Sequence, residues 1–351
     1  MEVVENHDEL VSYFERHQEA IGATRPCLID QFLEGALEVD VDLVRGVDWV
    51  VVGGVVEHIE AAGVHSGDSQ GVIPPQRLRR EICDKVEKMS QELAHRIGVI
   101  GHLNLQLAIK QDLIYMLEAN PRSSRSVPFV VKATGIPLID LGVAAMLGET
   151  EAKVNSHRYI WRARSGVSVK GVVFPFKKFP EADSILGPEM KSTGESMGRG
   201  SNYGEALMKG MLSSHMRFPE KGEVFFSLRE KDKAEMFSIA QELVAMGYTL
   251  SATKGTAQFF KSKGLECVEY KKVLEGRPHC VDKIRSGGVS LVINTTSGRQ
   301  SIEASFNIRR ACIDYSIPCL TESDTVDAFL IALKKTREKA FDVQPLPMMQ
   351  Q

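Results

Sequence analysis

The stretch that decides the fold of the first part of this chain is NLQLAIKQDLIYMLEANPR, residues 104–122. Polar and apolar residues alternate in two runs that flank a polar tip, and a period of two is typical of half-buried β-strands. The stretch therefore predicts a β-hairpin. Glu118 and Asn120 are two residues apart on its second strand, so their side chains face the same side.

The length of the turn decides which side chains of this hairpin meet. With a three-residue loop at 111–113, Gln106 lies directly opposite Glu118, beside the amide of Asn120. A two-residue loop would instead pair Gln106 with Leu117 and separate the three groups. We expect the three-residue loop.

Three oxygen-bearing side chains at one place suit a divalent metal. Mg²⁺ is commonly held by one or two carboxylates while the phosphates of a nucleotide complete its shell. The hairpin therefore predicts a metal site formed by Gln106, Glu118 and Asn120. The alternative is an amphipathic hairpin whose polar face meets solvent.

Composition limits the classes of function. At 351 residues the chain is long enough for about two domains. Its 43 basic residues are balanced by 46 acidic ones, so it lacks the basic field that non-specific nucleic-acid binding needs. No stretch approaches the ~18 apolar residues of a membrane span, and no signal peptide is recognisable. We expect no nucleic-acid partner and no membrane partner.

The cysteines indicate the compartment. Six of them are scattered without a Cys-x-x-Cys pair or any zinc-site spacing. This usage is typical of reduced thiols in a cytosol, so we expect structural cysteines and a cytoplasmic location.

Two patterns before the hairpin predict further strands. Before these strands, the run at 27–33, CLIDQFL, is expected to be buried. The next run, 37–43, alternates and places Glu38, Asp40 and Asp42 on one face, and residues 49–60 predict its hairpin partner. Three neighbouring carboxylates repel one another unless they are solvated or paired, so we expect some of them to meet water or a metal–nucleotide complex.

Two loops have the composition of ligand-binding segments. Residues 63–69, GVHSGDS, combine two glycines with four polar side chains, as where backbone approaches a ligand, although an ordinary surface loop has the same composition. Arg122 and Arg125 follow the hairpin among serines, and guanidinium groups suit bidentate contact with a phosphoryl group. A solvated basic turn is the alternative for this pair.

From Glu223 onward the pattern changes to strand, loop and helix in alternation. This alternation predicts a parallel sheet with helices on both faces. We therefore expect three parts: a partial domain at 1–150, a connecting part of the same unit at 151–215, and a separate domain at 216–351. No Gly-x-Gly-x-x-Gly follows the first strand of the last part, which disfavours a dinucleotide.

Ligands of parallel sheets bind at the carboxyl ends of the strands. Hydroxyl, amide and amino groups gather there in this sequence: Ser227, Lys233, Thr253, Thr256, Asn294 and Thr296. Residues 253–256, TKGT, offer backbone N–H groups, hydroxyls and an ammonium to a phosphate. Helix capping explains part of this set equally well. A binding domain fits better than a second active site, since no acid and base pair is evident.

Six segments, in this order, carry a resemblance to a known family: EVDVD at 38–42, EHIEAAGVHSGDS at 57–69, LEANPR at 117–122, GPEMKSTGE at 187–195, EGRPH at 275–279 and NTTSGR at 294–299. Together they resemble the large subunit of carbamoyl phosphate synthetase. The resemblance covers about the last third of that subunit. It implies a partial ATP-grasp domain with a mixed or antiparallel sheet and helices, followed by a methylglyoxal synthase-like, doubly wound parallel sheet, so the fold class is α/β and α+β.

The resemblance also implies an activity, the ATP-dependent phosphorylation of carbamate to carbamoyl phosphate for pyrimidine and arginine synthesis. Carried over by motif, Gln31, Leu33 and Glu38 would contact adenine and ribose. Mg²⁺ or Mn²⁺ would be held by the hairpin residues Gln106, Glu118 and Asn120, and Arg122 and Arg125 would face the phosphoryl group. The residues expected beside the nucleotide are Gly63, Val64, His65 and Ser66.

In the last part of the chain the resemblance implies an allosteric site for a nucleotide such as UMP or IMP. Its residues would be Ser227, Lys233, Thr253, Thr256, Lys272, Asn294 and Thr296. Lys254 adds a charge to this region that would favour an anionic effector, and Gln31 stands where some relatives have His.

The chain also departs from the family pattern. The N-terminal subdomain and the Gly-rich phosphate loop of the family's ATP-grasp domain have no counterpart in this sequence. Expected partners are therefore the remaining N-terminal section of the large subunit and, through it, the glutaminase small subunit. One alternative is a catalytically inert fragment that acts as a nucleotide-monophosphate-binding regulatory module. Another is a different ATP-grasp ligase, such as a biotin carboxylase relative, which the regulatory segments disfavour.

Overall fold

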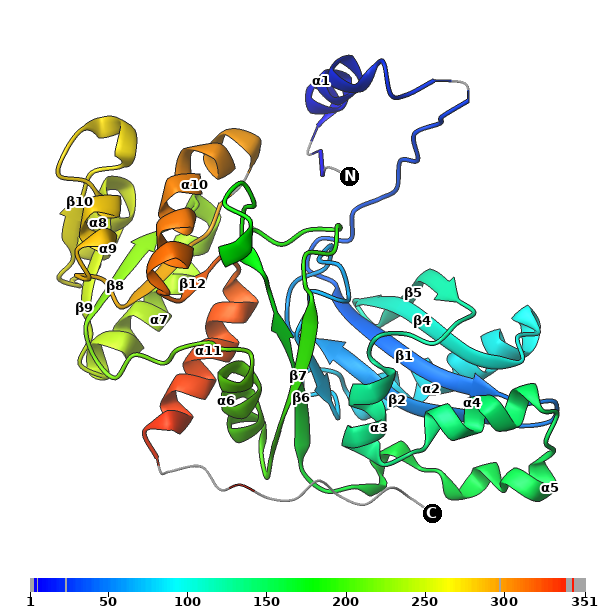
Figure 1. Cartoon of the computed structure of the whole chain (residues 1–351). Coiled ribbons are helices and arrows are strands. Elements are labelled where there is room, and N and C mark those ends of the chain that lie inside the picture. The colour runs from blue at the N-terminus through cyan, green and yellow to red at the C-terminus, as the bar shows by residue number, and fades with distance from the viewer. Residues whose placement is uncertain (1–2, 5, 23, 297, 339–342, 344–351) are drawn as a thin grey trace.

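Two sheets joined by packed helices make up the molecule (Figure 1). The computed structural model describes residues 3–4, 6–22, 24–296, 298–338 and 343. Both expected sheet types are present, one antiparallel and one parallel, so the predicted fold class is confirmed.

The first sheet has seven strands in the order β5-β4-β1-β2-β3-β6-β7, and its neighbouring strands pair antiparallel. The strands are β1 (Leu37–Arg45), β2 (Val50–His58), β3 (Gly71–Ile73), β4 (Gly101–Lys110), β5 (Leu113–Asn120), β6 (Val167–Val173) and β7 (Gly194–Gly200). Because β6 and β7 extend this sheet, residues on both sides of position 150 belong to it. The proposed division of the chain at that position stays a prediction.

Helices cover both faces of this sheet. The side chain of Glu57 accepts from the backbone N–H groups of Gln76 and Leu78, just before α2, and this fixes α2 on one face. Ser126, at the start of α3, donates to Asp42 on the opposite face. The helices of this part are α1 (His7–His17), α2 (Arg80–Ile97), α3 (Val127–Thr134), α4 (Leu138–Met146), α5 (Glu151–Val154) and α6 (Tyr203–Ser213).

The predicted hairpin is β4 and β5, but its predicted loop length was wrong. Two residues, Gln111 and Asp112, form the turn, and their φ angles of 50° and 64° are those of the type I′ turn that matches strand twist. Even so, Gln106 lies opposite Glu118, because the ladder shifts register there by one residue. Leu117 is the extra residue of this β-bulge.

The run at 27–33 was also predicted wrongly. It is an extended arm outside the sheets, and its side chains Leu28 and Ile29 are 83% and 59% exposed. An apolar run becomes a buried strand only where another strand pairs with it, and this arm has no strand partner among the described residues. The sequence MEVVE at 1–5 also suggests a short strand, but residues 1, 2 and 5 lie outside the described part, and Val3 and Val4 are not in a strand.

The second sheet is parallel, with the strand order β10-β9-β8-β11-β12. Its strands are β8 (Glu223–Ser227), β9 (Thr249–Thr253), β10 (Val268–Tyr270), β11 (Leu291–Asn294) and β12 (Cys319–Leu320). Its helices are α7 (Lys233–Ala245), α8 (Lys254–Ser262), α9 (Cys280–Arg285), α10 (Gly298–Tyr315) and α11 (Ser323–Thr336).

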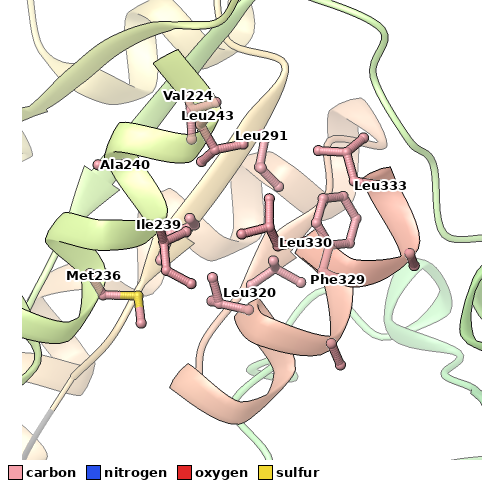
Figure 2. Packing of buried hydrophobic residues seen from close by; sticks show 14 of the residues in the cluster. Val224, Met236, Ile239, Ala240, Leu243, Leu291, Leu320, Phe329, Leu330 and Leu333 are labelled. Carbon is pink, nitrogen blue, oxygen red and sulfur yellow. The ribbon is translucent and has the colours of Figure 1, made fainter. Parts of the chain in front are cut away.

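Strand alternation gives this second sheet a core on each face. Val224 and Leu291 point toward α7 and α11, as Figure 2 shows, whereas Phe225 and Val292 point toward α9 and α10. The first of these clusters also contains residues of α6 and β6, such as Leu207 and Val169. One continuous core therefore joins the two sheets, because α6 packs against α11.

Two findings bear on the composition-based expectations. Among the described residues no single helix is long and apolar enough to cross a membrane, and α3 and α4 reach that length and hydrophobicity only as a pair bent by 115°. All six cysteines have free thiols.

Candidate nucleotide and metal site

One face of the antiparallel sheet carries a row of charged and amide side chains. Alternation along the strands explains the row, since every second residue of each strand points to this face. The apolar residues between them face α2 and its side of the core. The members of the row are Glu38, Asp40, Asp42, His58, Gln106, Glu118, Lys170 and Glu195.

His58 lies within ion-pair distance of two of the three carboxylates that the sequence places side by side. Its Nε2 lies 3.2 Å from Asp40 Oδ2, and its Nδ1 lies 3.5 Å from Glu38 Oε2. Burial acts to lower the pKa of His58, but the charge and hydrogen bond of Asp40 outweigh it and raise that pKa to about 9. Burial acts to raise the pKa of Asp40, but the imidazolium of His58 outweighs it and holds that pKa below the ordinary value. The sequence analysis missed His58, which ends a run of apolar residues.

Asp42, the third carboxylate, is held by neutral donors. Its two oxygens accept from Asn104 Nδ2 at 3.0 Å and from the hydroxyls of Ser124 and Ser126 at 2.6 Å each. Burial raises the pKa of Asp42, although these hydrogen bonds oppose the rise. The carboxylate thus fixes the loop after β5, which carries the two candidate arginines, to the sheet.

The structure brings the three candidate metal ligands together. Gln106 is paired opposite Glu118, and Asn120 Nδ2 donates to Glu118 Oε1 at 2.7 Å. Gln106 Nε2 donates to Ser66 Oγ at 2.8 Å, so the group left for a ligand is its carbonyl oxygen. One carboxylate and two amide oxygens match the hard oxygen donors of Mg²⁺ or Mn²⁺ when phosphates supply the rest. Within the described ranges, no group of three or more His, Cys, Asp and Glu side chains could hold a metal.

The loop at 63–69 lies against this row. The backbone N–H of Gly63 donates to Glu38 Oε1 at 3.0 Å, and Gly63 has a φ of 98° that favours glycine. Lys170 Nζ donates to the carbonyl oxygen of Ser66 at 2.9 Å. Val64 and His65 lie between these anchors, and His65 Nδ1 accepts from the N–H of Gly67 at 3.0 Å. Four of the predicted nucleotide-site residues are therefore positioned by Glu38, Gln106 and Lys170.

A segment before β7 holds the other end of this loop. Asp68 is fully buried and accepts from the backbone N–H groups of Lys191 and Ser192, each at 2.8 Å. The N–H of His65 donates to the carbonyl oxygen of Gly187 at 2.8 Å. The GPEMKSTGE motif is thus hydrogen-bonded to the GVHSGDS loop. The two segments are more than a hundred positions apart, so sequence spacing could not reveal this contact.

The candidate phosphoryl-binding arginines lie exposed on the loop after β5. Arg125 Nη1 is 2.9 Å from the sulfur of Met190, and Arg122 Nη1 donates to the carbonyl oxygen of Ser123 at 3.2 Å. Burial raises the pKa of Glu195, on β7, while Lys170 and Arg125 act to lower it. Arg125 therefore lies near the charged row.

The two residues predicted to contact the base precede β1. Gln31 is exposed and Leu33 is half-buried on the extended arm. A Cβ atom at Gly63 would lie 2.9 Å from the ring of Phe32, so the arm passes directly beside the loop. Glu34 pairs with Lys231 at 2.6 Å, which ties the arm to the part of the chain that contains the parallel sheet.

A separate cavity of about 320 Å³ lies at the carboxyl ends of the parallel strands. Five of the seven predicted effector residues line it: Ser227, Thr253, Lys272, Asn294 and Thr296. The other two, Lys233 and Thr256, are buried beside it. Lys233 Nζ pairs with Glu230 at 2.6 Å, and Thr256 Oγ1 accepts from the N–H of Leu228 at 3.3 Å.

Sequence reasoning missed one cation of this cavity. Arg229 lines it beside Lys272, and its Nη1 donates to the carbonyl oxygen of Thr296 at 3.2 Å. Arg229 lies two residues after the end of β8, at the edge where ligands of parallel sheets bind, so its position was the signal that could have found it.

Comparisons with known families agree with this geometry. Residues 1–152 match the family model described as carbamoyl-phosphate synthase L chain, ATP binding domain. Residues 235–321 match the MGS-like domain. The first match covers the hairpin and the charged row except Lys170 and Glu195, and the second covers most of the parallel sheet.

Curated relatives extend the match over nearly the whole chain. The carbamoyl phosphate synthase large chain, C-terminal section, of Methanocaldococcus jannaschii is 41% identical over 99% of this chain and 57% of the relative. The protein of the same name from Aquifex aeolicus is 41% identical over 96% of this chain and 65% of the relative. The carbamoyl phosphate synthase large chain of Pseudomonas putida is 44% identical over 97% of this chain.

This chain spans 31% of the length of the Pseudomonas relative and about two thirds or less of the two C-terminal sections. Both family models occur in the order that the two sheets have, and about two fifths of the residues are identical over almost the whole chain. The chain belongs to the carbamoyl phosphate synthase large-chain family and aligns with its C-terminal section.

Proposed function

We propose that the chain is the part of an ATP-dependent ligase that phosphorylates carbamate to carbamoyl phosphate. The observation that carries this proposal is that Gln106, Glu118 and Asn120 lie together and that Gln106 is hydrogen-bonded to Ser66 of the glycine loop. The oxygen ligands for a metal–nucleotide complex and the loop that would cover it therefore lie side by side. The family match supplies the reaction class.

Phosphoryl transfer asks mainly for positioning and charge neutralisation. When bound, Mg²⁺ or Mn²⁺ neutralises the β- and γ-phosphate oxygens. Arg122 and Arg125 lie exposed after the hairpin, free to reach the charge that spreads over the transferring group. Gly63, Val64, His65 and Ser66 cover the nucleotide, with Glu38 holding the loop through the Gly63 N–H. Gln31 and Leu33 lie on the arm that passes this loop.

The proposed partners follow from the relatives. We propose that the chain acts with the remaining N-terminal section of the large subunit and receives ammonia-derived carbamate through it. The glutaminase small subunit would contact that section. A cytoplasmic location and roles in pyrimidine and arginine synthesis complete the proposal.

A complementation assay tests this function. The chain is mixed with the N-terminal section, ATP, Mg²⁺, bicarbonate and ammonia, and carbamoyl phosphate is measured. Activity of the mixture is expected, together with its loss in Glu118→Ala. Tyr115→Ala, on the same edge strand but outside the ligand set, is the matched control and keeps activity. An inactive mixture of folded parts would contradict the proposal.

We propose further that the 320 Å³ cavity binds a nucleoside monophosphate, UMP or IMP, as an allosteric effector. Arg229 and Lys272 line the cavity as cations, and Thr253 and Thr296 offer hydroxyls. The N-terminus of α8 begins at Lys254, next to Thr253, where backbone N–H groups favour a phosphate. Lys233 and Thr256 support this end from beside the cavity.

Calorimetric titration with UMP, IMP and Mg-ATP separates the two sites. Lys272→Ala should weaken UMP binding at least tenfold and leave Mg-ATP binding unchanged, and Glu118→Ala should do the reverse. Binding of UMP without any binding of Mg-ATP would favour an inert regulatory module.

A further inference from the structure

Arg309, on α10, is a fully buried arginine with partners in two separate parts of the molecule. Its side chain is 0% exposed, and a buried guanidinium is stable only when it is paired and hydrogen-bonded. Nε donates to Asp183 Oδ1 at 2.6 Å, and Nη2 donates to the other carboxylate oxygen of Asp183. Nη1 donates to Asn294 Oδ1 at 3.0 Å and to Ser305 Oγ at 2.6 Å.

The two sides of this guanidinium belong to different sites. Asn294 and Ser305 line the 320 Å³ cavity, whereas Arg309 itself is not among its lining residues. Asp183 belongs to the segment between β6 and β7, 126 positions away along the chain. A single rigid group therefore joins the cavity to a segment of the first sheet.

Further hydrogen bonds connect Asp183 to the nucleotide loop. Lys191 Nζ donates to the carbonyl oxygens of Asp183 at 3.2 Å and Ile185 at 2.6 Å. The backbone N–H groups of Lys191 and Ser192 donate to Asp68, and Ser192 Oγ donates to the carbonyl oxygen of Gly67 at 2.8 Å. The residue before Gly67 in that loop is Ser66, the partner of Gln106 in the candidate metal site.

We infer that Arg309 is the positioning residue that couples occupancy of the cavity to the nucleotide loop at 63–69. This inference rests on the proposed function of both sites. A nucleoside monophosphate that bonds to Asn294 or Ser305 competes with Arg309 Nη1 for their oxygens. Because the guanidinium is planar and bidentate to Asp183, its Nη1 cannot turn away without disturbing that pair. The segment at 183–192, and the loop that it clasps, then shift between two arrangements.

Arg310 provides a matched control for this inference. It is the next residue of the same helix and donates to the carbonyl oxygens of Phe176 at 3.1 Å and Phe179 at 3.2 Å. It thus docks α10 on the same segment of the first sheet but does not line the cavity. Arg309→Lys keeps the positive charge but removes the bidentate guanidinium. Asp183→Asn keeps the side-chain volume but removes the ion pair.

Hydrogen–deuterium exchange on the full chain, with UMP as the probe, tests the coupling. In the wild type and in Arg310→Met, saturating UMP should change exchange at 63–69 and at 183–192. In Arg309→Lys and Asp183→Asn that change should fall at least fivefold, while the Kd for UMP stays within threefold. A parallel titration compares the Kd for Mg-ATP with and without saturating UMP. The two values should differ fivefold or more in the wild type and by no more than twofold in Arg309→Lys and Asp183→Asn.

The outcomes distinguish this inference from the function on which it rests. Failure of the wild type to bind UMP would overturn the proposed regulatory site, and the inference with it. Binding of UMP without any change in exchange at 63–69 would overturn the inference alone. So would an undiminished change in Arg309→Lys and Asp183→Asn, or an equal loss in Arg310→Met.

Discussion

Gln106 lies directly opposite Glu118 although only two residues form the turn of their hairpin. Leu117 makes this possible, because it is the extra residue of a β-bulge and is left without a partner on β4. Its side chain is 46% exposed, so it contributes little to the core. The bulge, and not the turn, sets the register of the candidate metal site.

Deletion of Leu117 should therefore preserve metal binding. The shortened β5 would keep Gln106 opposite Glu118 in a regular ladder, with Asn120 on the same face. Deletion of Ala119 is the matched control, because it moves Asn120 to the other face and should weaken binding about tenfold or more. Titration with Mn²⁺ in the presence of ATP measures both. Loss of binding on deletion of Leu117 would show that the bulge itself shapes the site.

The His58–Asp40 pair predicts a pH-dependent contribution to stability. The pKa of His58 is raised to about 9 on folding, so the stability it contributes is complete below the unfolded value near 6.5. It is lost as the pH rises through about 9. His58→Gln leaves Asp40 buried without its cation, which should cost about 3 kcal/mol of the free energy of unfolding at pH 6.

Urea unfolding at pH 6, 8 and 10 measures this effect. The difference between wild type and His58→Gln should shrink from pH 8 to pH 10. His157 is 89% exposed, so His157→Gln is the matched control and should change stability little at any of these pH values. A difference that does not vary with pH would mean that His58 acts by packing alone.

Patterns within short stretches predicted much of this molecule. The hairpin, the alternating strand β1 and the strand–helix repeats of the second sheet follow from periodicity, which depends on local geometry. The wrong loop length has a physical cause, since a bulge adds a residue without changing the pattern of polar and apolar residues around it. The arm at 27–33 is apolar enough to be buried, but no strand among the residues that the structure describes pairs with it.

Contacts between residues that are far apart in the chain could not be predicted from the sequence. His58 is one polar residue at the end of an apolar strand, and its role appears only when β1 lies beside β2. Arg309 lies within an ordinary helical pattern, and its carboxylate partner is 126 positions away. Nothing in the local sequence distinguishes such residues from solvated ones.

Glu205 predicts a second pH effect, with the opposite sign. A hydrogen bond from Lys209 lowers the pKa of Glu205 to about 2, with help from the N–H and hydroxyl of Ser201 at 2.9 Å each. Its stabilisation of the start of α6 is present above the ordinary value of 4.5 and is lost as the pH falls toward 2. Glu205→Gln should cost about 1 kcal/mol at pH 7 and almost nothing at pH 2.

Thermal or urea unfolding between pH 2 and pH 7 checks this difference. Glu266 is an exposed carboxylate in a loop, and Glu266→Gln serves as the control for a general effect of charge. An equal loss of stability in the two variants would rule out a specific role for the Glu205 interactions.

Close approach of α6 to β7 predicts a steric effect at Gly198. A Cβ atom at this position would lie 2.1 Å from the backbone nitrogen of Gly210 and 2.3 Å from the carbonyl oxygen of Ala206. Both atoms belong to the backbone of α6, which cannot move aside as a flexible side chain would. Gly198→Ala should therefore push α6 off the sheet and cost about 2–3 kcal/mol of the free energy of unfolding.

In Gly187→Ala, the matched control, the new Cβ meets nothing within 4 Å. Because α6 packs against α11 in the core that joins the two sheets, the loss should lower the unfolding midpoint reported from both sheets. Equal midpoints for the two variants in urea would show that the helix accommodates the methyl group.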